Sequence, residues 1–317
     1  MPSDNPAMTA RQWLTETIGA TVSLFIVIVL VNMSIDIYGL FRDTKGRHLP
    51  VYGDEGVAKY LLSEKYVPNN FNAILIGSSV SANWNTHGID GFRVYNESLD
   101  GGNAVEVRAI ADQALASSRI QAAILIVHPY LTASHDFNTV RLTPRLNLEA
   151  LGSLNLLDAY KSEAEAKLHL GRQEFDEFGT DDFGDIPNKM NPHLQKLMAA
   201  GSDFYVDEIA MSNYKALIDE LHAAKVQIIF VVPPLWQPIF ASKANAFASY
   251  SRGILANKLD RDLIIDFTSD EFAGFRNDQN NFRDGVHLTN QAAQEVIAEI
   301  NAKIDQWIRN GQQPNQR

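Results

Sequence analysis

The hydrophobic pattern of the chain starts with a long apolar segment near the N-terminus. Residues 18–35, IGATVSLFIVIVLVNMSI, contain no charged side chain. Eighteen helical residues span about 27 Å, which is close to the roughly 30 Å hydrocarbon core of a bilayer. All faces of such a helix are apolar. This favours a membrane-spanning helix over one that lies in the membrane plane or is buried in a core.

We predict a polar tail over 1–17 and a transmembrane anchor over 18–38, which stays uncleaved because no small-residue cleavage site follows the apolar run. Trp13 and Tyr38 are expected at the two membrane interfaces. One basic residue precedes the segment and three follow it: Arg11, and then Arg42, Lys45 and Arg47. By the positive-inside rule this would put the large domain in the cytoplasm. Long translocated domains override the rule, so the charges leave the orientation open.

From about residue 50 onward, apolar runs of strand length alternate with helical patterns. The runs are short, aliphatic and bounded by turn residues, as is typical of buried parallel strands: 73–76, 92–95, 122–127, 226–232 and 263–267. Helical spacing of apolar residues predicts helices over 103–117, 207–224 and 290–308. Together they predict a doubly wound α/β fold with a five-stranded parallel sheet over 50–309, followed by a tail over 310–317.

Residues 134–205 do not follow this alternation and are predicted to be an insertion between the third and fourth strands. The segment contains a helical pattern over 148–170 and an acidic, glycine-containing stretch, EFDEFGTDDFGD. Two interpretations stay open. The insertion is a lid or partner surface, or it is a solvated excursion without a chemical role.

Composition narrows the classes of function. The 317 residues are 45% hydrophobic and include no Cys, which excludes a disordered chain, Cys-ligated zinc and thiol catalysis. The net charge of −11 argues against nucleic-acid binding. A nucleotide-binding domain is disfavoured by the lack of GxGxxG and of a P-loop lysine. His87, His128 and His135 with Asp136 lack the HxH or HExxH spacing of metal ligands, so we expect neither metal nor cofactor.

Polar residues follow three of the predicted strands, where ligands of open parallel sheets bind. The first strand leads into 77–79, Gly-Ser-Ser, and a serine here presents its hydroxyl at the sheet edge. The glycines at 101–102 follow the second strand and allow backbone N–H groups to approach an anion. Asp284 precedes His287 by three residues, a spacing that lets the carboxylate orient the imidazole. Taken singly, these features are equally typical of a helix cap, a loop and a surface turn.

In combination they resemble the SGNH (GDSL-like) hydrolase superfamily, whose flavodoxin-like sheet agrees with the fold predicted above. The segments 74–79 (ILIGSS), 94–101 (VYNESLDG) and 284–287 (DGVH) are similar to three of its blocks. The resemblance implies that Ser79 is the nucleophile, His287 the general base and Asp284 the residue that orients it. It further implies that the backbone amides of Ser79 and Gly101 form an oxyanion hole. The resemblance extends over roughly 70–130 and 226–308.

Two positions depart from the family pattern. Ser78 replaces the usual Asp of the first block, a change that also occurs in membrane-anchored relatives. The third block, Gly-x-Asn-Asp, is missing, and with it the Asn that donates a third hydrogen bond to the oxyanion. His128 or Tyr130, and less readily Asn103, are the candidates for that donor. Loss of one such donor costs about two to three orders of magnitude in rate.

The membrane-anchored branches of this family include alginate and peptidoglycan O-acetylation proteins and the teichoic-acid D-alanylation protein. The resemblance therefore implies a serine-dependent acyl esterase or O-acyltransferase that acts, through an acyl-Ser79 intermediate, on a cell-envelope or exported polysaccharide. It implies a single-pass protein of the bacterial inner membrane with a periplasmic catalytic domain, against the flanking charges, and other membrane proteins of an envelope assembly complex as partners. The alternative is a catalytically decayed scaffold or polysaccharide-binding subunit.

Overall fold

A five-stranded parallel sheet forms the centre of the molecule, as the sequence pattern predicts. The computed structural model describes residues 9–136, 141–168, 170, 175–184 and 204–310. The strands follow the order β2-β1-β3-β4-β5, with every pair parallel. Their bounds are β1 Ala73–Ile76, β2 Val94–Asn96, β3 Ala122–Ile126, β4 Gln227–Val232 and β5 Leu263–Asp266. The predicted α/β fold class is confirmed.

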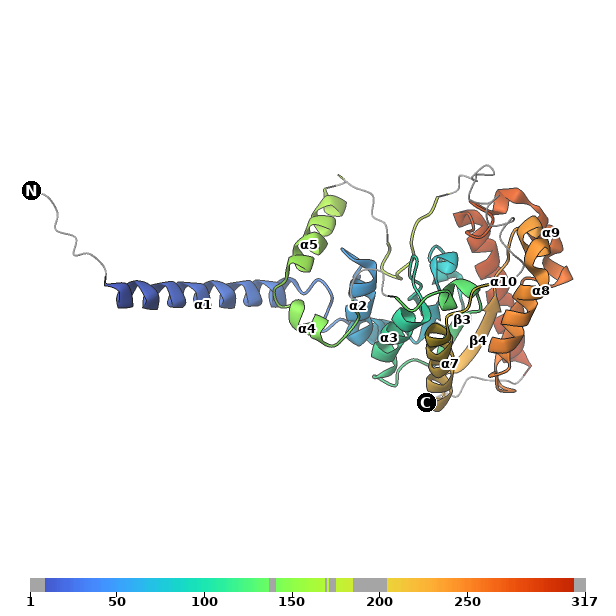
Figure 1. Cartoon of the computed structure of the whole chain (residues 1–317), viewed down its shortest axis with the longest axis horizontal. Coiled ribbons are helices and arrows are strands. Elements are labelled where there is room, and N and C mark those ends of the chain that lie inside the picture. The colour runs from blue at the N-terminus through green and yellow to red at the C-terminus, as the bar shows by residue number, and fades with distance from the viewer. Residues whose placement is uncertain (1–8, 137–140, 169, 171–174, 185–203, 311–317) are drawn as a thin grey trace, which may run out of the picture.

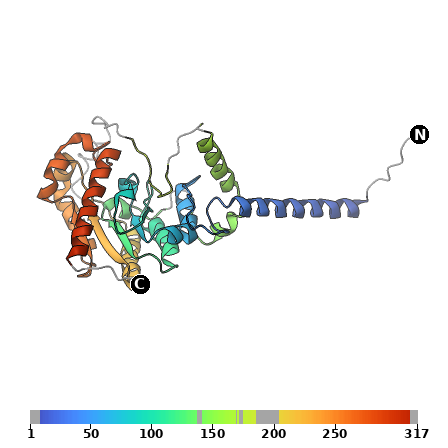
Figure 2. The ribbon, with the colours of Figure 1, turned by 180° about the vertical axis from the view of Figure 1, so that it is seen from behind.

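Helices cover both faces of the sheet (Figures 1 and 2). Alternate strand residues point to opposite sides, so that Ile74 and Ile76 enter one apolar core while Ala73 and Leu75 enter the other. The first core is completed by α2 Glu55–Asn70, α3 Ala104–Leu115, α7 Glu208–Ala223 and α8 Gln237–Leu255. The second is completed mainly by α10 Asn290–Arg309, with α9 Ala273–Asn277 beside it.

Several predicted bounds shift because a polar side chain caps the helix instead of continuing it. Asn103 accepts hydrogen bonds from the backbone N–H groups of Val105 and Glu106, so α3 begins one residue later than predicted. Asp207 caps α7 through Ala210 in the same way. The second strand begins at Val94 and not at residue 92. The helices α2 and α8 lie in segments to which the sequence pattern assigned no range.

The predicted single helix over 148–170 is wrong. The chain forms α4 Arg145–Glu149 and α5 Leu154–Lys167 with a turn between them. At this turn the carbonyl of Leu151 accepts a hydrogen bond from Asn32 Nδ2 at 2.6 Å. Gly152 packs so closely on Ile28 that a Cβ atom would lie 3.3 Å from its Cγ2. These contacts with the N-terminal helix interrupt the helical run.

The apolar N-terminal segment is the helix α1, Ala10–Ile35, which projects from the domain (Figure 2). Its start is fixed eight residues earlier than predicted by a capping box between Thr9 and Gln12. The predicted end at residue 38 is wrong. Asp36 adopts a left-handed conformation with φ 52°, and Tyr38 is buried in the domain core, not placed at a membrane interface.

Among the described residues, α1 is the helix that is long and apolar enough to cross a membrane. Its most apolar 18-residue window has a mean hydropathy of 2.4, and almost all of its surface is exposed. Signal sequences share these properties. The helix joins the domain through a buried carboxylate, because Asp36 forms an ion pair with Arg47 at 2.9 Å and accepts from the backbone N–H groups of Phe41 and Arg42.

Candidate active site

Ser79 lies where the chain leaves strand β1, which stands between β2 and β3 in the sheet. The turn depends on Gly77, since a Cβ atom at this position would lie 2.0 Å from Ser81 Oγ and 2.9 Å from Ser98 Oγ. The next residues form a short 3₁₀ helix, Ser79–Ser81, at whose N-terminus Ser78 makes no side-chain capping bond. The first strand therefore ends in a sharp turn that presents Ser79 at the carboxyl edge of the sheet.

Ser79, His287 and Asp284 form a continuous line of hydrogen-bonding groups. Ser79 Oγ lies 2.9 Å from His287 Nε2, and His287 Nδ1 lies 2.6 Å from Asp284 Oδ2. The carboxylate favours the tautomer with the proton on Nδ1, which leaves Nε2 to accept from the serine hydroxyl. The three residues that the sequence nominated therefore lie in the order needed to pass a proton.

Asp284 is held by its own loop. Its Oδ1 accepts from the backbone N–H groups of Val286 at 3.1 Å and His287 at 2.8 Å, while Gly285 makes the turn with φ +86°. Burial raises the pKa of the Asp284 carboxyl, but the hydrogen bonds and the charge of His287 outweigh burial and hold this pKa at about 2. Asp284 is thus ionised at neutral pH.

A hollow of about 340 Å³ opens beside Ser79. Gly101 forms part of its wall in a left-handed conformation with φ +63°. The neighbouring Gly102 is required by packing, because a Cβ atom there would lie 2.4 Å from Leu99 Cβ. The hollow is lined by Ser78, Ser79, Gly101, Gly102, Asn103, Tyr130, Ala133, Ser134 and Asp136. Of the sequence-nominated oxyanion residues, Gly101, Asn103 and Tyr130 share this hollow with Ser79.

Two of the nominated residues have other contacts. His128 is 2% exposed, packs edge-on against the Tyr130 ring and accepts from the Tyr130 backbone N–H through Nδ1. Burial, and then the charge of His287, lower the pKa of His128 to about 3, so its ring is neutral. Asn103 uses Oδ1 to cap α3 and donates from Nδ2 to the Asp136 carbonyl at 2.6 Å.

Buried charged residues that the sequence did not reveal lie below the loop of Gly101. Lys59, completely buried on α2, donates to Glu55 Oε1 at 2.9 Å and to the Ser98 carbonyl. The second oxygen of Glu55 accepts from the backbone N–H of Asp100 at 2.9 Å. The Lys59–Glu55 pair therefore holds the loop by hydrogen bonds to the residues on either side of Leu99, which are Ser98 and Asp100. No helix was predicted over α2, so nothing in the sequence pattern indicated that Lys59 is buried.

The neighbouring Glu97 is also fully buried. One oxygen accepts from Ser63 Oγ at 2.9 Å, while Oε2 has no hydrogen-bond partner among the described residues. Burial raises the pKa of Glu97 from 4.5 to about 8, although the Ser63 hydrogen bond and the charge of Lys59 oppose the rise. The folded protein thus keeps a proton on Glu97 at a pH where the unfolded chain has released it.

We expect this proton to make stability fall as pH rises. The raised pKa contributes stability that is complete below about pH 4.5 and is lost as the pH approaches about 8. Between about pH 5 and about pH 8, wild type should lose roughly 2–4 kcal/mol relative to Glu97→Gln, which cannot ionise. Urea unfolding of both proteins across this range measures the difference. If the free energy of unfolding changed with pH in the same way in wild type and Glu97→Gln, the expected ionisation of Glu97 would be contradicted.

The described part of the acidic stretch, 175–184, packs against the site. The backbone N–H of Asn96 donates to the Phe178 carbonyl at 2.7 Å, and that of Asp181 donates to the Ala82 carbonyl at 2.9 Å. The Phe183 ring lies edge-on to the His287 ring at 5.9 Å. Residues 175–184 are therefore packed against the domain and are not a solvated excursion. Residues 137–140, 169, 171–174 and 185–203 of the predicted insertion lie outside the described residues.

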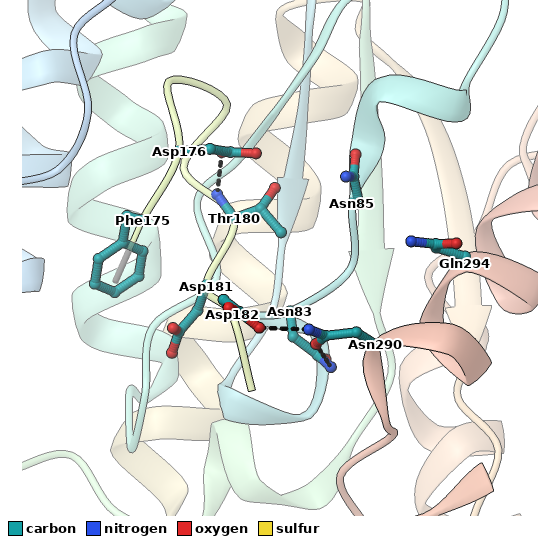
Figure 3. A pocket seen from close by; sticks show the side chains of 9 residues that line it. All are labelled: Asn83, Asn85, Phe175, Asp176, Thr180, Asp181, Asp182, Asn290 and Gln294. Carbon is teal, nitrogen blue, oxygen red and sulfur yellow. Dashed lines mark hydrogen bonds between the residues drawn. The ribbon is translucent and has the colours of Figure 1, made fainter. Parts of the chain in front are cut away.

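This stretch encloses a second hollow of about 260 Å³ on the side of the site that faces α10 (Figure 3). Its walls come from three parts of the chain: the segment after Ser79, residues 175–182, and the start of α10 just after His287. Asn83 Nδ2 donates to the Leu288 carbonyl at 3.0 Å and so ties the wall to the histidine loop. One hollow thus opens beside Ser79, and the second adjoins the histidine loop through Asn83 and Asn290.

No protein-family model matches the chain, and no curated protein matches it. The chain is similar to the psychrotrophic esterase EstA from Pseudoalteromonas sp., in a structure inhibited by monoethylphosphonate. The identity is 13% and the TM-score 0.33, over 75% of this chain and 99% of that one.

Proposed function

We propose that this protein is a serine-dependent acyl esterase or O-acyltransferase with Ser79 as its nucleophile. The observation that carries the proposal is the line of Ser79 Oγ, His287 and Asp284, with successive distances of 2.9 and 2.6 Å. The hollow next to Ser79 provides room for an acyl group. The resemblance to SGNH hydrolases supports an acetyl group on a cell-envelope or exported polysaccharide as the substrate.

In the first half-reaction, Ser79 Oγ attacks the ester carbonyl while His287 Nε2 takes the hydroxyl proton. The bond from Oγ to the carbonyl carbon forms, and the carbonyl electron pair moves to its oxygen. The backbone N–H groups of Ser79 and Gly101 are proposed to stabilise this oxyanion. When the intermediate collapses, the C–O bond to the alcohol breaks and His287 returns the proton to the leaving oxygen.

In the second half-reaction, water or a sugar hydroxyl attacks the acyl-Ser79 ester. His287 takes the proton of the incoming hydroxyl and gives it to Ser79 Oγ as the acyl group leaves. Asp284, ionised because its pKa is held at about 2, stabilises the imidazolium that forms in each half-reaction. Hydrolysis and transfer differ only in which hydroxyl reaches the acyl carbonyl.

Tyr130 is the candidate we favour for the third oxyanion donor. Its side chain lines the hollow beside Ser79, whereas His128 lies behind it in the core. Burial, and then the charge of Asp284, raise the pKa of the Tyr130 hydroxyl, so it keeps its proton and is able to donate a hydrogen bond. This assignment supplies a donor where the Gly-x-Asn-Asp block is missing.

We further propose that α1 anchors the protein in the bacterial inner membrane with the catalytic domain in the periplasm. The exposed apolar surface of α1 supports anchoring. The proposed polysaccharide substrate supports the periplasmic orientation, against the count of flanking basic residues. Other membrane proteins of an envelope assembly complex are the proposed partners.

Covalent labelling tests the proposed nucleophile. A fluorophosphonate should react with the full chain in detergent, with displacement of fluoride by Ser79 Oγ, to give one adduct per chain. Peptide mass spectrometry should place the adduct on Ser79 and not on Ser78 or Ser81, which share its turn. A chain that takes no label, or takes it elsewhere, would remove the proposal and leave the scaffold or polysaccharide-binding alternative.

A further inference from the structure

The hollow between residues 175–182 and α10 carries a further inference, which rests on the proposed function. We propose that it is a saccharide subsite that binds the alcohol side of the ester, and that it selects sugar units without carboxylate or phosphate groups. The catalytic roles proposed for Ser79, His287 and Asp284 make no use of this hollow. Its position, its unpartnered polar atoms and its charge each support the assignment.

The position of the hollow fits the alcohol side of an ester. In acyl transfer by a serine, the histidine protonates the leaving oxygen, so the leaving or accepting alcohol lies on the histidine side of the serine. The hollow adjoins that side, because Asn290 in its wall follows His287 by three residues. The hollow lined by Gly101 and Tyr130 opens beside Ser79 itself and is left for the acyl group.

Two buried polar atoms in the wall lack hydrogen-bond partners. Asn83 is 2% exposed and Thr180 is 7% exposed. Asn83 Oδ1 and Thr180 Oγ1 make no hydrogen bond to any described residue. Buried polar groups are normally satisfied, so each such atom calls for a ligand or water. Both residues line the hollow, so the unmet hydrogen-bonding capacity belongs to its wall.

The remaining lining is suited to hydroxyl groups. In Figure 3 the side chain of Gln294 points from α10 toward the segment that carries Asn85, and Thr180 lies across from it on the 175–182 segment. Amide groups donate and accept, and carboxylates accept, at paired atoms with fixed spacing, which matches the adjacent hydroxyls of a sugar ring. Because eight of the nine lining residues are polar, an aliphatic alcohol would leave their hydrogen-bonding groups unsatisfied.

The charge of the wall decides among sugars. Three carboxylates line the hollow, those of Asp176, Asp181 and Asp182, and of the described lining residues none is Lys or Arg. Within the wall, Asp182 accepts a hydrogen bond from Asn290 Nδ2 and Asp176 accepts one from the backbone N–H of Thr180, which holds both carboxylates in position. A uronic acid or phosphate group would be repelled here, whereas neutral and amine-bearing sugar units would not.

Direct binding to the full chain tests the subsite without depending on catalysis. The protein is kept in a detergent without a sugar headgroup, and saturation-transfer NMR measures binding of cellotriose, the glucosamine trimer and trigalacturonate. We expect the first two to bind and trigalacturonate to bind at least about 10-fold more weakly, as like-charge contacts disfavour it. Equal or tighter binding of trigalacturonate would overturn the selection against acidic sugars.

Variants of the wall locate the binding. Thr180→Val and Gln294→Ala each remove hydrogen-bonding groups and should weaken cellotriose binding about 3–10-fold, the range expected for one lost hydrogen bond. Gln306→Ala, an exposed position further along the same helix, is the matched control and should bind as wild type does. Gln294→Lys should improve trigalacturonate binding. Unchanged binding in all three wall variants, or no binding of any trisaccharide to wild type, would overturn the subsite.

The labelling experiment separates this inference from the proposed function. Saccharide binding with the expected variant effects, in a protein that fluorophosphonate does not label, would keep the subsite and remove acyl transfer. Labelling of Ser79 without saccharide binding would keep acyl transfer and remove the subsite.

Discussion

Ser79→Ala and His287→Ala are each expected to lower kcat for hydrolysis of p-nitrophenyl acetate by about four to six orders of magnitude. Each substitution breaks the 2.9 Å contact through which the nucleophile loses its proton. Without the imidazole the hydroxyl stays protonated and is a weak nucleophile, and without the hydroxyl no acyl-enzyme forms. Steady-state release of p-nitrophenolate measures the loss.

The double variant tests whether Ser79 and His287 act together in one catalytic step or contribute to the rate independently. Residues that act as one unit are not additive, so Ser79→Ala/His287→Ala should be about as slow as either single variant. Thr268→Ala, at the end of β5, is the control for a lost hydroxyl and should leave the rate at the wild-type level. Single variants that keep the wild-type rate, or losses that multiply in the double variant, would contradict the proposed roles.

Lys59→Met is expected to lower the free energy of unfolding by about 3–5 kcal/mol, the usual cost of removing one partner of a buried ion pair. The substitution keeps a similar volume but leaves Glu55 Oε1 and the Ser98 carbonyl without their donor. Both contacts hold the loop that carries Gly101. We therefore expect kcat to fall as well, and by a larger factor than KM changes. Urea unfolding and steady-state kinetics on the same preparation give the two values.

Lys303→Met is the matched control. Lys303 forms ion pairs with Glu271 and Glu299 at the surface of α10, where such pairs contribute about 0–1 kcal/mol. Its stability and kcat should lie close to those of wild type. If Lys59→Met were no less stable than Lys303→Met, the buried pair would not hold the loop as described.

The sheet was predictable because its signals are local. Strands β1, β3 and β4 are short, mostly apolar runs buried along their whole length, and polar or glycine residues follow β1 and β2 within a few positions. Ser79 follows β1, Gly101 follows β2, and His287 precedes α10. A doubly wound topology brings those strand ends to one edge, so separate local patterns were enough to nominate residues that the structure places side by side.

The features that sequence did not reveal depend on contacts between distant segments. Lys59 resembles a solvent-facing lysine until the burial of α2 against the 97–100 loop is known. The break between α4 and α5 depends on Asn32, which is 119 residues away from Leu151 in the chain. The packing of 175–184 beside His287 likewise follows from the turn of the chain around Ser79, and not from its own composition.

The junction of α1 with the domain fixes more than the fold. Asn32 donates to the Leu151 carbonyl and accepts from the Tyr160 hydroxyl at 2.7 Å, so the last turn of the helix is joined to α5 without a flexible linker. If α1 crosses a bilayer as proposed, Ser79 stands at a constant height above the lipid headgroups. Only those stretches of polymer that pass at this height would then be modified. The place where the polymer is exported, and not its abundance in the surrounding compartment, would determine which stretches are modified.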